Sequence, residues 1–192
     1  MAKLPSTEYT GHRTEIPGLI FFDVSDVRDE RGSFQEKYQH AKLVAAGMPE
    51  SFTVVQNSLS FNKQTGVTRG FHAEPWDKYI TVVTGKVFAA YVDLRQSDSF
   101  GKVATIEIGP NTAVFLPQGV ANSFQTLEDN TYYLYSVNAH WSADNYEQYC
   151  FVNLADEMLA VDWPIALDKA IVNNRDRNHP MLKDVKPMEV QQ

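Results

Sequence analysis

Side chains that can do chemistry concentrate in one stretch, residues 66–79, with the sequence GVTRGFHAEPWDKY. Arg69, His72 and Lys78 all fall within it, and the sequence on both sides is typical of β-strand. Charged side chains are rarely buried unless they are paired. A strand that carries an arginine, a histidine and a lysine toward one space is therefore not built for packing alone. We expect an active-site strand that handles an anionic substrate.

A metal site is the first alternative for this stretch. Jelly-roll barrels of the cupin kind bind a metal through the pattern His-x-His-x-x-x-Glu and a histidine that follows a later Pro-x-Gly. The corresponding positions here are His72, Glu74, Lys78 and Asn122. A lysine in place of the carboxylate repels a cation, and asparagine replaces the last histidine. The sequence therefore predicts that no metal is bound.

Without a metal, the remaining residue types favour proton transfer next to a carbonyl group. His72 can take a proton near neutral pH, and Lys78 can stabilise the oxyanion that develops. A tyrosine such as Tyr135 can return a proton from another direction. Each residue also has an ordinary interpretation, because a histidine can be structural, an arginine can form an ion pair and a tyrosine can pack in a core.

Composition limits the class of protein. The chain has 192 residues, which suits a single domain over residues 1–192, and 43% of them are hydrophobic, as in a globular protein. Its net charge of −7 argues against a general nucleic-acid or membrane-surface binder. The single cysteine, Cys150, excludes an internal disulfide and is expected to be a small buried hydrophobic residue. No leader and no membrane-spanning run is visible, so we expect a cytoplasmic protein.

The elements that must position these residues are mostly strands. Apolar or alternating runs between turn residues predict strands at 16–27, 51–62, 78–95, 102–108, 112–117 and 131–139. Residues 1–16 are expected to form an arm or an edge strand, and a turn is expected at Arg31-Gly32. A short helix is predicted within 37–48, with Gly47 as its end.

The clearest predicted hairpin covers residues 78–95 and turns at Thr84-Gly85. Its apolar residues are nearly continuous, which indicates cover on both faces, either inside a two-sheet sandwich or at a subunit contact. About seven to ten short strands indicate an all-β fold, an antiparallel jelly-roll (cupin-like) barrel or sandwich. From about residue 142 onward, proline and charge recur, so we expect packed loops and a few short peripheral helices.

Several motifs in fixed order resemble the dTDP-4-dehydrorhamnose 3,5-epimerase (RmlC) family. The resemblance runs from IPGLIFFDV to HPMLKDVKP, and the HAEPWDKYI form is similar to one sub-branch of that family. The matching stretches are DERGSFQE, VVQNSLSF, GVTRGFHAEPWDKYI, GKVFAAYVDLR, FGK, LPQGVANSFQ and NRDRNHPMLKD. The resemblance implies a homodimeric jelly-roll enzyme without a cofactor that acts on dTDP-4-dehydro-6-deoxy-D-glucose. Protons at C3 and C5, both adjacent to the C4 ketone, would be removed and returned on opposite faces.

The resemblance also implies roles for individual residues. The catalytic positions are His72 as base, Asp176 as its orienting partner, Tyr135 as acid and Lys78 as the group that stabilises the enolate. The implied substrate-binding positions are Arg31, Phe34, Glu36, Gln56, Arg69, Asn122 and Trp141. Of these, the arginines would hold the diphosphate and Trp141 would stack on the thymine. The local pattern alone would make Asp176 a solvated surface residue.

The sequence departs from the family pattern at three places. Asn122 replaces the usual histidine, Ser58 replaces an amide, and His140 replaces a tyrosine or aspartate. Three further readings stay open at this point. They are an epimerase that acts at C3 or C5 only, a non-catalytic nucleotide-sugar binding domain, and a metal-dependent cupin enzyme.

Overall fold

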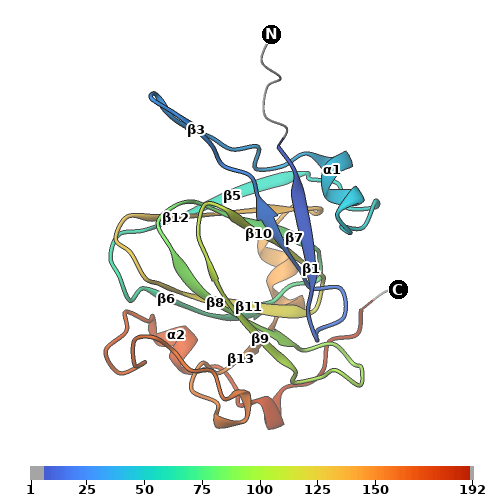
Figure 1. The fold of residues 1–192 in the computed structure, drawn as a ribbon. Helices are drawn as coiled ribbons and strands as arrows, with labels where there is room; N and C mark the ends of the chain where they lie inside the picture. The colour runs from blue at the N-terminus through green and yellow to red at the C-terminus, as the bar shows by residue number, and fades with distance from the viewer. Residues whose placement is uncertain (1–6, 191–192) are drawn as a thin grey trace.

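Two antiparallel β-sheets face each other in the computed structural model, which describes residues 7–190 (Figure 1). One sheet has six strands in the order β1-β2-β10-β7-β12-β5, and the other has five in the order β13-β6-β11-β8-β9. A separate pair, β3-β4, projects away from both sheets. This is the antiparallel jelly-roll sandwich that the sequence predicts.

The strands of the six-stranded sheet are β1 (Tyr9–Arg13), β2 (Ile20–Val24), β10 (Thr112–Leu116), β7 (Lys78–Thr84), β12 (Thr131–Val137) and β5 (Gln56–Asn62). Those of the five-stranded sheet are β13 (Cys150–Val152), β6 (Thr68–Ala73), β11 (Val120–Thr126), β8 (Val87–Asp93) and β9 (Val103–Ile108). The projecting pair is β3 (Val27–Asp29) and β4 (Gly32–Phe34). The short helices are α1 (His40–Ala45), η1 (Ala143–Gln148), η2 (Glu157–Leu159), α2 (Asn174–Arg177) and η3 (Leu182–Asp184).

The hairpin predicted over residues 78–95 is wrong. β7 pairs with β10 and β12, whereas β8 pairs with β11 and β9. The turn at Gly85, whose φ is +84°, therefore carries the chain from one sheet to the other. Two β-prone runs around a glycine look the same in a sequence whether the second strand folds back beside the first or crosses the sandwich.

Three apolar layers explain why both runs are so hydrophobic. Between the sheets, Ile80 and Val82 of β7 pack with Tyr91 of β8. The outer face of the six-stranded sheet is covered near β7 and β10 by Leu43 of α1 and Phe52. The outer face of the five-stranded sheet is covered by apolar residues of the chain after residue 150. The continuous apolar character of 78–95 is thus satisfied within one chain and does not require a subunit contact.

The predicted helix and edge strand are confirmed. α1 begins after Gln39, whose side chain accepts a hydrogen bond from the Lys42 backbone N–H at 2.8 Å. The helix is followed by Gly47 at φ +112°, a conformation that glycine adopts without strain. β1 lies at the edge of the six-stranded sheet, within the predicted 1–16 segment. Residues 1–6 of that segment lie outside the described residues.

β11 was not predicted because buried polar residues interrupt its pattern. Ser123 and Gln125 are fully buried. The Gln125 amide donates to the Thr68 hydroxyl and to the Ile165 carbonyl, and its oxygen accepts from the Ile165 N–H at 2.7 Å. Satisfied polar groups of this kind are compatible with a core strand, although they break the apolar signal.

The segment after residue 142 forms short helices and loops against the five-stranded sheet, as predicted. It also adds strand β13, which pairs with β6 beside His72. Cys150 at the start of this strand is half-buried rather than buried, and its thiol lies 3.5 Å from the Lys186 carbonyl oxygen. No helix within residues 7–190 is long and apolar enough to cross a membrane.

Candidate active site

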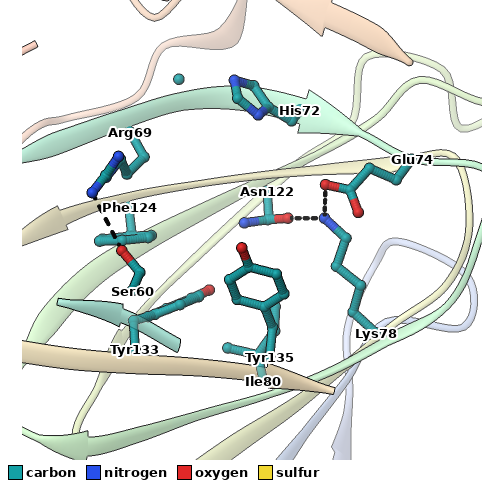
Figure 2. A pocket seen from close by; sticks show the side chains of 11 residues that line it. Ser60, Arg69, His72, Glu74, Lys78, Ile80, Asn122, Phe124, Tyr133 and Tyr135 are labelled. Carbon is teal, nitrogen blue, oxygen red and sulfur yellow. Dashed lines mark hydrogen bonds and ion pairs between the residues drawn. The ribbon is translucent and has the colours of Figure 1, made fainter. Parts of the chain in front are cut away.

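A cavity of about 160 Å³ lies between the two sheets and collects most of the predicted catalytic residues (Figure 2). It is lined by residues of β5, β6, β7, β11 and β12 and by Glu74, which directly follows β6. The lining residues are Ser60, Arg69, Gly70, His72, Glu74, Lys78, Ile80, Asn122, Phe124, Tyr133 and Tyr135. Figure 2 shows His72 on one wall, from β6, and Tyr135 on the facing wall, from β12.

A β-bulge in β6 directs two predicted residues into this cavity. Asn122 of β11 pairs with His72, but Phe124 pairs with Arg69, so β6 contains one extra residue between these pairs. Residues three apart would point to opposite faces of a regular strand. The bulge interrupts the alternation of side chains between the two faces of β6, so both Arg69 and His72 line the cavity.

Asp176 lies directly behind His72. Its Oδ1 is 3.4 Å from His72 Nε2, and its side chain is only 2% exposed, so the surface position suggested by the local sequence is wrong. The Gly70 N–H donates to Oδ2 at 2.7 Å, and the Asn173 amide donates to the same oxygen at 3.2 Å. Burial raises the pKa of Asp176, but hydrogen bonds from His72 and Gly70 outweigh burial and lower it. A charged carboxylate thus stands where it can orient the imidazole and stabilise its protonated form.

A second histidine, His179, stands on the other side of the same carboxylate. Its Nε2 is 3.8 Å from Asp176 Oδ1, and its ring centroid is 5.6 Å from that of His72. Both ring nitrogens are buried without a hydrogen-bond partner of ordinary geometry, although the Val152 backbone lies near the ring. Burial and the neighbouring His72 lower the pKa of His179. Sequence reasoning missed this residue because nothing local distinguishes it from a surface histidine.

The four positions of the cupin metal pattern do converge, but a cation already occupies their centre. The Lys78 ammonium is 2.8 Å from Glu74 Oε1 and donates to Asn122 Oδ1 at 2.8 Å (Figure 2). Lys78 is buried, with 4% exposure, so this pair is shielded from solvent. An ammonium held this way is placed to stabilise a developing oxyanion in the cavity.

Tyr135 supplies a hydroxyl on the wall opposite His72. Burial raises the pKa of Tyr135, and the Glu74 carboxylate raises it further, while Arg69 and Ser58 act in the opposite direction. The phenol therefore keeps its proton at neutral pH and is able to act as an acid.

Arg69 brings a positive charge to the cavity that no acidic group neutralises. Its guanidinium contacts Asn62 Oδ1 at 3.2 Å and the Ser60 hydroxyl at 3.3 Å. Among residues 7–190, no carboxylate lies within ion-pair distance of it. A guanidinium with neutral partners is available to an anionic ligand, and its fork suits paired phosphate oxygens.

A neighbouring cavity of about 330 Å³ shares His72, Glu74 and Tyr135 with the first. Its other lining residues are Gln56, Ser58, Trp76, Val137, Trp141, Tyr146 and Tyr149. The Trp141 backbone N–H donates to Gln56 Oε1 at 3.0 Å, and the Trp141 side chain is 54% exposed. The predicted residues Gln56 and Trp141 thus lie in an aromatic pocket beside His72 and Tyr135.

The structure does not bring Arg31, Phe34 and Glu36 to either cavity of the same chain. Arg31 and Phe34 lie on the projecting β3-β4 pair, where Phe34 is 66% exposed (Figure 1). Glu36 contacts the Lys42 ammonium at 2.7 Å and the Thr7 hydroxyl at 2.7 Å. A contact between the projecting pair and a bound substrate would therefore need a second copy of the chain.

Several residues that line the two cavities were not predicted as site residues, among them Glu74, Trp76, Tyr146 and Tyr149. Glu74 follows His72 by two residues, and strand alternation could have placed both on one face. Tyr146 and Tyr149 come from η1 and the residue after it, a segment without a periodic signal. Trp76 and Tyr149 are in edge contact, with ring centroids 5.5 Å apart.

The fold and this set of side chains define a jelly-roll enzyme whose cavity is arranged for proton transfer beside an anionic ligand. The sequence profile of the dTDP-4-dehydrorhamnose 3,5-epimerase family matches residues 13–184. The chain belongs to this family.

Three relatives give the extent of the likeness. The RmlC homolog of Streptococcus pyogenes serotype M6 is 46% identical over 179 residues, covering 91% of this chain and 90% of that protein. The dTDP-4-dehydrorhamnose 3,5-epimerase of Pseudomonas aeruginosa is 31% identical, and the match covers 90% of this chain and 95% of that protein. The structure of RmlC from Streptococcus suis in complex with dTDP-D-xylose has a TM-score of 0.89 and 44% identity, covering 94% of this chain and 95% of that one.

Proposed function

We propose that the chain epimerises dTDP-4-dehydro-6-deoxy-D-glucose at C3 and C5 to dTDP-4-dehydro-L-rhamnose. The observation that carries the proposal is the placement of His72 and Tyr135 on facing walls of one cavity, with the Lys78 ammonium between them (Figure 2). Inversion at a carbon needs a base on one face and an acid on the other. Both carbons are adjacent to the C4 ketone, so one oxyanion-stabilising group serves both.

Each inversion proceeds in two proton transfers. His72 removes the proton, and the C–H electrons form the carbon–carbon double bond of an enolate while the C4 carbonyl becomes an oxyanion. Lys78 donates a hydrogen bond to that oxyanion, and Asp176 stabilises the imidazolium. Tyr135 then gives its proton to the opposite face of the carbon. The imidazolium loses a proton and the phenolate regains one through solvent, which restores the starting state without a cofactor.

The nucleotide is bound by groups outside this reacting set. Arg69 pairs with the diphosphate, and the exposed Trp141 ring stacks on the thymine beside Gln56. Asn122 positions the Lys78 ammonium. Arg31, Phe34 and Glu36 keep their predicted substrate-binding roles only in an assembly, where the β3-β4 pair of one chain reaches the cavity of another.

We further propose a homodimer of a cytoplasmic enzyme. The outer face of the six-stranded sheet is covered near α1 but not over β5 and β12. Leu59 is 57% exposed there, and Phe61 is 48% exposed with its ring 4.8 Å from that of Tyr132. An uncovered apolar face of this kind is suited to self-association.

Proton exchange with solvent tests the reaction. The protein is mixed with dTDP-4-dehydro-6-deoxy-D-glucose in heavy water with a chelator present, and deuterium is followed by NMR at each carbon. Uptake at both C3 and C5 is expected. Uptake at one carbon would instead indicate a single-site epimerase, and tight binding without exchange would indicate a nucleotide-sugar binding domain. Activity that the chelator abolishes would indicate a metal-dependent enzyme.

A further inference from the structure

His179 is a buried polar residue that the proposed reaction leaves unused. It is 9% exposed, and among residues 7–190 neither ring nitrogen has a hydrogen-bond partner of ordinary geometry, although the Val152 backbone lies near the ring. A buried polar group without a partner is costly, so such a group in a folded protein calls for an explanation. The nearest charged oxygen is Oδ1 of Asp176, at 3.8 Å, which is too long for a hydrogen bond.

His179 completes a set of three metal-ligating groups. One ring nitrogen each from His72 and His179 and one carboxylate oxygen of Asp176 all lie within 4.8 Å of one another. Two imidazoles and a carboxylate are a donor set that suits zinc and its neighbours among the divalent transition metals. Bond lengths of roughly 2.0–2.2 Å to each donor require the three groups to draw together by a small movement only.

The carboxylate is already oriented for such a role. Its Oδ2 is tied by the Gly70 N–H and the Asn173 amide, at 2.7 and 3.2 Å. Oδ1, in contrast, lies 3.4 Å from His72 Nε2 and 3.8 Å from His179 Nε2. Fixing one oxygen and presenting the other is what an outer shell does for a metal-ligating carboxylate. His72 is 32% exposed and lines the cavity, whereas Asp176 and His179 are buried behind it, so an ion would reach the site past the His72 side chain.

From this geometry we propose that His72, Asp176 and His179 bind one divalent zinc ion, and that the ion inhibits the enzyme by binding His72 Nε2 and the Asp176 carboxylate, which ends their contact and removes the negative charge that stabilises the imidazolium. The site lies behind His72, away from the Lys78 ammonium that fills the cupin metal position. Binding follows from the donor set alone, whereas inhibition rests on the proposed function.

Cobalt(II) is the probe for binding, because its visible absorption reports coordination without any assay of turnover. Titration of the full chain should give a visible band that saturates at one equivalent and disappears when Zn²⁺ is added. His179→Gln and His72→Gln should each weaken binding by more than the roughly 10–100-fold that loss of an outer-shell partner costs. His179→Phe is a second variant that retains a ring against Phe151, whose centroid is 4.7 Å away. Thermal unfolding verifies that each variant is folded.

His12→Gln is the matched control. His12 also contacts an aspartate, Asp23, at 2.7 Å, but this pair is exposed and belongs to no set of three ligands. It should bind cobalt like the unmodified chain. Absence of the band, equal binding by His179→Gln and the unmodified chain, or loss of binding in His12→Gln would overturn the proposal. So would a cobalt–thiolate charge-transfer band, which would place the metal at Cys150.

The inhibitory consequence is measured separately in the deuterium-exchange assay. Zn²⁺ should slow exchange by the unmodified chain, and a chelator should restore it. The same Zn²⁺ concentration should have a far smaller relative effect on His179→Gln. Cobalt binding without any epimerase activity would refute the proposed function and leave the metal site standing. Full activity without cobalt binding would refute the metal site alone.

Discussion

At the scale of single residues, His72 faces the cavity while the Asp176 carboxylate behind it is buried. His72→Asn keeps a polar side chain of similar reach but cannot accept a proton at neutral pH. Turnover should fall by about 10²–10⁴-fold, the usual contribution of a general base, while affinity for dTDP stays unchanged. His12→Asn, at the exposed pair, is the control in the exchange assay. Near-normal turnover by His72→Asn would exclude the proposed mechanism.

The Glu74 carboxylate acts on Tyr135, the proposed acid. Its carboxylate contributes to the raised pKa of Tyr135, second only to burial. An acid is active only while protonated, so activity is lost as the pH rises through its pKa. Glu74→Gln removes a negative charge, lowers the pKa of Tyr135 and should move the alkaline limb of the kcat/KM profile to lower pH.

Two comparisons sharpen this experiment. Glu50→Gln, at an exposed position, should leave the alkaline limb in place. Tyr135→Phe should remove most activity at every pH, because it removes the acid itself. If the alkaline limb of the kcat/KM profile does not move in Glu74→Gln, Tyr135 is not the group whose deprotonation limits the reaction at high pH.

Residue types in the sequence predict a proton-transfer chemistry, but they do not predict which residues surround the reacting groups. Arg69, His72 and Lys78 were visible as an unusual cluster because they lie within ten residues of one another. Asp176 is separated from His72 by 104 residues, and only the resemblance to a family predicted their contact. His179 had no such signal, since its burial depends on how the last segment packs.

At the scale of elements, α2 packs so closely against β6 that residue 70 has no room for a side chain. A Cβ added to Gly70 would lie 2.6 Å from Cγ of Asp176. Gly70→Ala should displace the Asp176 carboxylate from His72 and reduce kcat, with little change in nucleotide binding. Gly109→Ala is the control, because a Cβ there would meet nothing within 4 Å. Unchanged kcat in Gly70→Ala would show that the position of Asp176 does not matter for turnover.

Most strands were predictable, and the exceptions have physical causes. Alternating and apolar runs locate the strands, but a run does not say in which sheet it lies. The sequence therefore predicts a hairpin at Gly85, where the chain in fact crosses from one sheet to the other. β11 was hidden because its buried side chains include Ser123 and Gln125. The bulge in β6 depends on its pairing with β11, which local sequence does not encode.

At the scale of the whole molecule, self-association is expected over β5 and β12 and not at residues 78–95, for which the sequence left a subunit contact open. The apolar residues of 78–95 are buried by other parts of the same chain, whereas Leu59 and Phe61 remain exposed. Phe61→Glu should convert a dimer into a monomer in sedimentation velocity and leave thermal unfolding of the chain cooperative. Turnover should fall as well if the projecting β3-β4 pair serves the other chain.

The control for this prediction is Met158→Glu, because Met158 is even more exposed, at 68%, but lies on η2 at the other sheet. It should remain a dimer. A concentration-independent monomer in the unmodified chain would contradict the dimer proposal.

We also predict that the chain forms a single domain over residues 1–192.

The order of strands also bears on synthesis of the protein. From β5 onward, every link between consecutive strands crosses from one sheet to the other except β8 to β9. Both sheets therefore stay incomplete on the ribosome until β12 and β13 have emerged, and the carboxylate behind His72 emerges later still. A nascent or prematurely ended chain has a histidine without its partner. If His72 and Asp176 act as proposed, catalytic competence arrives only with the last few dozen residues, after both sheets have all their strands.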